Sequence, residues 1–143
     1  MSDSSRTTYS GTAPFLTAAG ARAVVDAALA EAARLGVPQC VAVVDSGGHL
    51  LAFARSDGAR IGSISIALTK AVSAATRKRP TAEEGGGDPI MTIRLALAAE
   101  RLTGIGGGLP LVIDGHVVGA VGVSSGTVDE DTTVARAGLA ALA

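Results

Sequence analysis

The chain has 143 residues, a formal net charge of −1, 48% hydrophobic residues and 17% charged residues. This length fits one domain with one core, and the apolar content excludes a disordered chain. The balanced charge and the presence of only three aromatic residues argue against nucleic acid as a partner, because nucleic-acid binding needs a basic surface or stacking platforms.

The first 16 residues are rich in Ser and Thr and show no hydrophobic periodicity, so we expect a flexible arm at 1–16 before a single domain at 17–143. They contain no apolar stretch long enough for a signal peptide, and no segment approaches the roughly 20 apolar residues that span a bilayer. We therefore expect a cytoplasmic protein that does not bind membranes. From Thr17 the pattern predicts a helix, which Gly36 and Pro38 end.

A β-hairpin is predicted next, because the β-like runs 41–45 and 49–54 are separated by Ser46-Gly47-Gly48. Cys40, the single cysteine, lies in the apolar run that leads into the first strand. It is therefore interpreted as a small buried hydrophobe, and it excludes a disulfide within the chain.

A long helix is predicted over 60–79. Its apolar residues recur every three or four positions and should face the core: Ile61, Ile64, Leu68, Ala71 and Ala75. The basic run at 77–79 fits the solvated last turn of that helix, where cations complement the helix dipole.

The second half of the chain contains three further signals. Asp88-Pro89 resembles a helix N-cap followed by proline and predicts a helix through Arg101. Asp114-Gly115 predicts a type I′ turn inside a second hairpin, and Thr127 with Glu130 forms a capping box before the last helix. The three glycines at 85–87 indicate either a lid or a disordered loop.

The element order is therefore helix, hairpin, long helix, loop, helix, hairpin, helix. Both hairpins require antiparallel neighbours, so the sequence predicts an α+β fold with helices packed on an antiparallel sheet.

Two long strings carry a resemblance to a known family: LGVPQCVAVVDSGGHLLAFARSDGA at 35–59 and GGGLPLVIDGHVVGAVGVSSGT at 106–127. They resemble the GlcG/HbpS-like (DUF336) family of haem-degrading proteins. The resemblance implies a profilin-like α+β fold with a sheet of about five strands, a homo-oligomer, and haem or a related tetrapyrrole as the ligand.

For haem, the candidate iron ligands are His49 and His116, each of which begins the outgoing strand of its hairpin. The alternative, which the sequence favours for both, is a surface residue at the edge of a turn. Met91 could supply an axial thioether or belong to the core.

A different constellation suits an enzyme without a cofactor. Arg55 and Asp57 lie two residues apart and point the same way if strand geometry persists, so Arg55 could bind a carboxylate substrate. Lys70 is flanked by Ala67 and Ala71, and an amine in an apolar setting suits Schiff-base or general-base work. The alternative is a surface Arg55–Asp57 pair and a lysine that reaches out to solvent.

Further ligand-binding candidates follow the third helix. Glu100 and Arg101 form an acid–base pair of which only one member can face a small pocket. Gly107 and Gly108, within the glycine run 106–108, could present backbone amides to an anion.

Three hypotheses remain open at this level. The chain could bind a small ligand such as haem; it could be an isomerase, lyase or hydrolase acting on a small organic acid through Arg55, Asp57 and Lys70; or it could be a structural partner.

Overall fold

The computed structural model describes residues 8–82, 89–98 and 101–143. Within these ranges the order is α1 (Ala18–Leu35), β1 (Cys40–Asp45), β2 (Leu50–Arg55), α2 (Ser63–Arg77), α3 (Pro89–Ala98), β3 (Gly108–Ile113), β4 (His116–Ser124) and α4 (Val128–Ala140). This order confirms the predicted succession of helices and hairpins. The described part contains no helix long and apolar enough to cross a membrane.

The sheet is antiparallel throughout and has the order β2-β1-β4-β3. The described residues form four strands, so the expected number of about five was too high. The two hairpins lie side by side because β1 pairs with β4 over the whole of β1, from Cys40 opposite Ser124 to Asp45 opposite Gly119. β1 is therefore central, and five of its six residues are buried.

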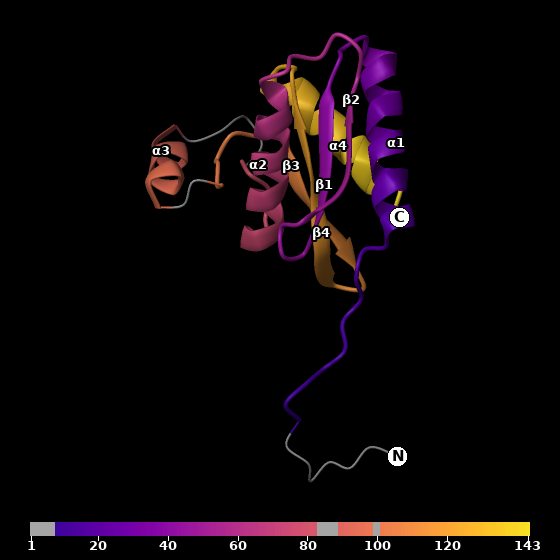
Figure 1. The fold of residues 1–143 in the computed structure, drawn as a ribbon, viewed down its shortest axis with the longest axis vertical. Helices are drawn as coiled ribbons and strands as arrows, with labels where there is room; N and C mark the ends of the chain where they lie inside the picture. Colours follow the sequence, from indigo (N-terminus) through magenta and orange to yellow (C-terminus); the bar gives the residue numbers. More distant parts are fainter. Residues whose placement is uncertain (1–7, 83–88, 99–100) are drawn as a thin grey trace.

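Helices cover both faces of the sheet (Figure 1). Along β1, Val41 and Val43 pack in the core cluster that includes residues of α1 and α4. Cys40, Ala42 and Val44 alternate with them and pack against α2. This alternation is the strand period of two, and it produces one apolar cluster on each face.

Local chemistry sets the ends of the helices and one of the turns. Thr17 caps α1 by accepting a 3.0 Å hydrogen bond from Gly20 N, and the capping box of α4 is present as predicted. Asp114 and Gly115 have φ values of 49° and 78°, which the type I′ turn between β3 and β4 requires. Of the expected arm, residues 8–15 have no regular structure, and Leu16 is already buried in the core.

The inward face of α2 differs from the prediction. Ala71 and Ala75 are buried as expected, but Ile61 is 74% exposed and Ile64 is also on the surface. The cause is the close approach of α2 to the sheet, since a Cβ on Gly122 of β4 would collide with the backbone of Ala67 and Ala71. Ala67 and Ala71 therefore occupy the closest approach to the sheet, whereas Ile61, which precedes α2, and Ile64 lie outside it.

α3 stands to one side of α2, away from the sheet (Figure 1). It begins at Pro89 as predicted, but none of its ten residues is buried. Ile93 is 60% exposed and Leu97 is 84% exposed. The predicted N-cap Asp88, the glycines at 85–87 and Glu100 lie outside the described residues.

Candidate functional site

The two histidines lie at one end of the sheet, on separate hairpins. His49 follows the β1–β2 turn, where its Nδ1 is 3.2 Å from Asp45 Oδ1, and His116 is the first residue of β4. Partial burial alone would raise the pKa of Asp45, but the N–H groups of His49 and Gly47 donate to its carboxylate and hold the pKa below its usual value. Asp45 therefore organises this turn.

Arg55 and Asp57 do not point the same way, because β2 ends at Arg55 and a turn follows. Arg55 lies directly opposite Cys40 in the β1–β2 ladder, and residues opposite each other point to the same face of the sheet. Arg55 is therefore on the face that α2 covers, where Cys40 packs. Asp57 instead lines a cavity of about 200 Å³ together with residues of α1, including Leu29 and Ala33. The strand geometry on which the predicted pair depended does not extend to Asp57.

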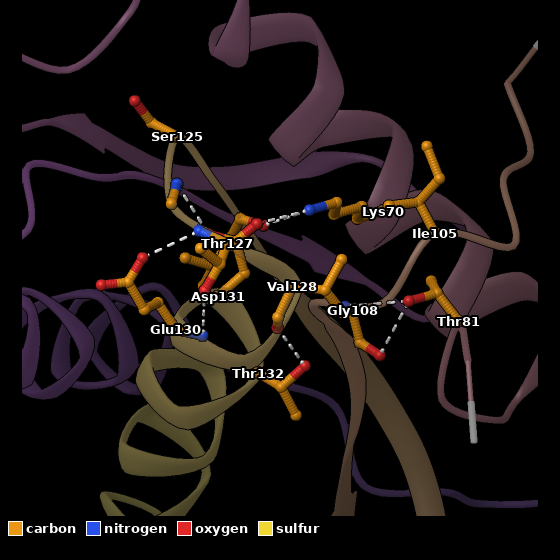
Figure 2. A network of polar contacts seen from close by, with 12 residues as sticks. Lys70, Thr81, Ile105, Gly108, Ser125, Thr127, Val128, Glu130, Asp131 and Thr132 are labelled. Carbon is orange, nitrogen blue, oxygen red and sulfur yellow. Dashed lines mark hydrogen bonds and ion pairs between the residues drawn. The ribbon is translucent and has the colours of Figure 1, made fainter. Parts of the chain in front are cut away.

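Lys70 is buried and paired. Its side chain is 2% exposed, and its Nζ donates to Asp131 Oδ2 at 2.9 Å and to the backbone oxygen of Val123 at 2.8 Å. Figure 2 shows Lys70 reaching from α2 towards Asp131 in the first turns of α4. The purely apolar setting expected for Lys70 is therefore wrong, and so is the alternative of a lysine that reaches solvent.

The other oxygen of Asp131 is also engaged. Oδ1 accepts from Gly126 N at 3.0 Å, and the buried Gln39, with its amide nitrogen turned inward, donates to Oδ1 at 3.0 Å and to the backbone oxygen of Ser124 at 2.8 Å. This Lys70 network, formed by Lys70, Asp131 and Gln39, ties α2, α4 and the start of β1 together. Neither Asp131 nor Gln39 was predicted from the sequence, because an aspartate in the first turn of a helix is readily explained by the helix dipole.

The glycine run before β3 lies against this network. A Cβ on Gly107 would approach Lys70 Nζ to 3.0 Å and the backbone oxygen of Val123 to 2.8 Å. Gly108 N already donates to Thr81 Oγ1 at 3.0 Å, and Gly107 O accepts from Val123 N at 2.9 Å. Gly107 and Gly108 are buried packing positions in this structure, and the amide of Gly108 is not available to an anion.

Two polar anchors hold the segment that carries α3. At its beginning, Thr81 and Gly108 exchange backbone and side-chain hydrogen bonds (Figure 2). At its end, Thr103 N donates to Ser73 Oγ of α2 at 2.8 Å. α3, the part of this segment that the structure describes, therefore stands away from the sheet, between the two anchors in sequence.

An apolar pocket of about 390 Å³ opens between α3 and the body of the domain. Five residues line it: Pro89, Thr92, Ile93, Ile105 and Val128. Val128 is the first residue of α4, and its Cγ1 would meet a Cβ placed on Gly106, so Gly106 packs directly against it. Four of these five residues are apolar, which suits the apolar part of a small ligand.

The remaining predicted residues lie outside this pocket lining. Arg101 is exposed just after α3, and its backbone oxygen accepts from Ser73 Oγ at 3.4 Å. Met91 is on α3 and is 36% exposed. Among the described residues, no three His, Cys, Asp or Glu side chains gather closely enough to hold a metal ion.

Known proteins resemble this chain over most of its length. A family model described as "Haem degrading protein HbpS-like" matches residues 16–140. An uncharacterized 15.0 kDa protein from the dhaT–dhaS intergenic region of Citrobacter freundii is 37% identical over 128 residues, which are 87% of this chain and 89% of that protein.

Solved structures share the fold. The crystal structure of Klebsiella pneumoniae protein ORFY superposes with a TM-score of 0.85 at 32% identity, covering 96% of this chain and 97% of that one. The crystal structure of a PduOC–haem complex superposes with a TM-score of 0.76 at 25% identity, covering 90% and 95%.

Proposed function

This chain belongs to the HbpS-like family, and on that premise we propose that it binds haem or a related tetrapyrrole in the apolar pocket between α3 and the start of α4. The observation that carries the proposal is the α3 pocket itself, meaning the cavity lined by Pro89, Thr92, Ile93, Ile105 and Val128. Its volume falls within the range of small-ligand sites, which is about 300–1,000 Å³.

The exposed apolar side chains of α3 support the same proposal. The helix carries Ile90, Ile93 and Leu97, which are at least 60% exposed. Removing apolar surface from water is favourable by about 25 cal/mol per Å². A macrocycle inserted into the pocket would contact Ile93 of α3 on one side and Ile105 and Val128 on the other. It would gain this stabilisation by removing the exposed apolar surface from water.

The charged residues around the pocket also suit the polar edge of a tetrapyrrole. The first turn of α4, next to Val128, contains Asp129 and Glu130, so carboxylate groups of the ligand would point away from it. Arg101 is exposed beyond the other end of α3 and would attract them. The family relative PduOC, solved as a haem complex, adds support from outside this chain.

Titration with haemin, followed through its Soret absorbance, tests the proposal. We expect saturable binding by the wild type and much weaker binding by Ile105→Glu, which places a charge in the pocket wall at a residue that is 41% exposed. The matched control is Leu50→Glu, since Leu50 is also a large exposed residue but lies beside His49 at the far end of β1. Unsaturable binding by the wild type, or loss through Leu50→Glu and not through Ile105→Glu, would contradict the proposal.

An enzyme built on Arg55, Asp57 and Lys70 is less well supported. These side chains lie in three different surroundings: the face under α2, the cavity beside α1 and the buried network with Asp131. General acid–base work requires the groups to lie within hydrogen-bond reach of one substrate. We therefore favour ligand binding over this catalytic alternative.

We also propose that the chain self-associates, as the family resemblance implies. Ile61, just before α2, and Ile64, in its first turn, are exposed and lie three positions apart, and a second copy would cover them. Light scattering should give a mass above that of one 14.0 kDa chain, and Ile61→Glu should lower it. A wild-type protein that is monomeric at micromolar concentration would contradict this.

A further inference from the structure

The side chains that bind haem iron are few in this sequence and lie away from the α3 pocket. The chain has two histidines, one cysteine, one tyrosine and two methionines, and axial ligands to haem come from these residue types. Each of them can be placed relative to the pocket, apart from Met1, which lies outside the described residues.

Both histidines are at the wrong end of the sheet. The pocket lies beside Gly106, just before β3, and Gly107 bonds to Val123 near the end of β4. His116 is the first residue of β4, seven residues before Val123, which is about 23 Å of strand. His49 follows the β1–β2 turn at the same end as His116, where its ring is paired with Asp45.

The other candidates are no better placed. Cys40 is fully buried in β1, with its Sγ directed to the backbone oxygen of Arg60. Tyr9 is 95% exposed in the extended segment before α1. Met91 is on α3, but successive helical residues turn by about 100°, so Met91 points away from the side on which Pro89, Thr92 and Ile93 line the pocket.

The pocket therefore offers apolar contact to a ring system but, among the residues that line it, no side chain that binds iron. Resting on the proposed function, we infer that the α3 pocket holds its ligand by apolar contact with the ring system and without an axial bond from this chain, so that metal-free porphyrins are ligands equal to haem. The central metal of the ligand then makes no difference to affinity, and recognition depends on the shape and apolar surface of the ring.

A parallel titration of the whole protein with haemin and with metal-free protoporphyrin tests this inference. Dissociation constants within about threefold of each other are expected, and Ile105→Glu should weaken both ligands to the same degree. His49→Ala, His116→Ala and Met91→Leu should leave both constants and the haemin spectrum unchanged. Circular dichroism of each variant establishes that the fold is retained.

Haemin that binds more than about tenfold more tightly than protoporphyrin would overturn the inference while leaving the proposed function standing. The same conclusion would follow if one histidine variant lost affinity for haemin alone. If neither tetrapyrrole binds, the proposed function fails and the inference fails with it. Added imidazole gives a second readout, because a haem iron without a protein ligand should bind it and shift the Soret band.

Discussion

The buried ion pair between Lys70 and Asp131 provides the sharpest prediction about stability. Both side chains are almost fully buried, at 2% and 3% exposure, and their charged atoms are 2.9 Å apart. Lys70→Met keeps the length of the side chain but removes the bonds from Nζ to Asp131 and to the backbone oxygen of Val123. The carboxylate of Asp131 is then left buried without its cation.

Breaking a buried pair from one side typically costs about 3–5 kcal/mol, because the remaining charge is desolvated and uncompensated. For a chain of this length that loss corresponds to a fall in Tm of roughly 10–15 °C. When Asp131→Asn is combined with Lys70→Met, the buried negative charge is removed together with its cation. The double variant should therefore lose less stability than the sum of the two single variants, by more than about 2 kcal/mol.

Urea unfolding followed by far-ultraviolet circular dichroism measures these changes, since the chain contains no tryptophan. Arg34→Met is the matched control, because Arg34 and Glu31 form an even shorter pair at 2.6 Å, but the arginine side chain is 69% exposed. Its unfolding midpoint should barely move. A loss below about 1 kcal/mol for Lys70→Met, or single-variant losses that simply add, would show that the two charges do not stabilise each other in the folded protein.

Three other predictions concern packing, pH and thiol reactivity. Gly122→Ala should destabilise the protein by more than about 1–3 kcal/mol in urea unfolding, because the new methyl group meets the backbone of α2, whereas Gly62→Ala, with open space around it, should be tolerated. Asp45→Asn should lower the free energy of unfolding at pH 7, and its difference in stability from the wild type should disappear as the pH falls well below 3.8. A carboxyl whose pKa is lowered on folding stabilises the fold above its unfolded pKa, and that stabilisation is lost as the pH falls through the folded pKa. Cys40 should react with an aromatic disulfide reagent only after urea unfolding, because burial raises the pKa of its thiol despite the nearby charge of Arg55; rapid reaction of the folded protein would contradict its burial.

Local signals predicted the secondary structure well. The hairpin turn at Asp114-Gly115, the cap at Thr17 and the capping box at Thr127 each depend on residues within a few positions of one another. Such contacts can be read directly along a sequence. The order of helices and hairpins followed from them, although the number of strands did not.

The site could not be predicted in the same way because its contacts are long-range. Lys70 and Asp131 are 61 positions apart, and nothing near either residue indicates the other. The face of α2 was misassigned for a related reason: the helical period identifies a stripe, but Gly122 on a distant strand decides that alanines and not Ile61 or Ile64 fit against the sheet. The α3 pocket likewise joins residues from 89 to 128, which only the fold brings together.

The proposed function requires that the ligand occupies the α3 pocket. Its most direct test is a methyl NMR titration with protoporphyrin on protein labelled at isoleucine and valine, since ring currents of a bound macrocycle shift nearby methyl signals strongly. The largest shifts are expected at Ile93, Ile105 and Val128, which line the pocket. Shifts concentrated instead at Val117, beside His116, would place the ligand at the opposite end of the sheet and contradict the claim.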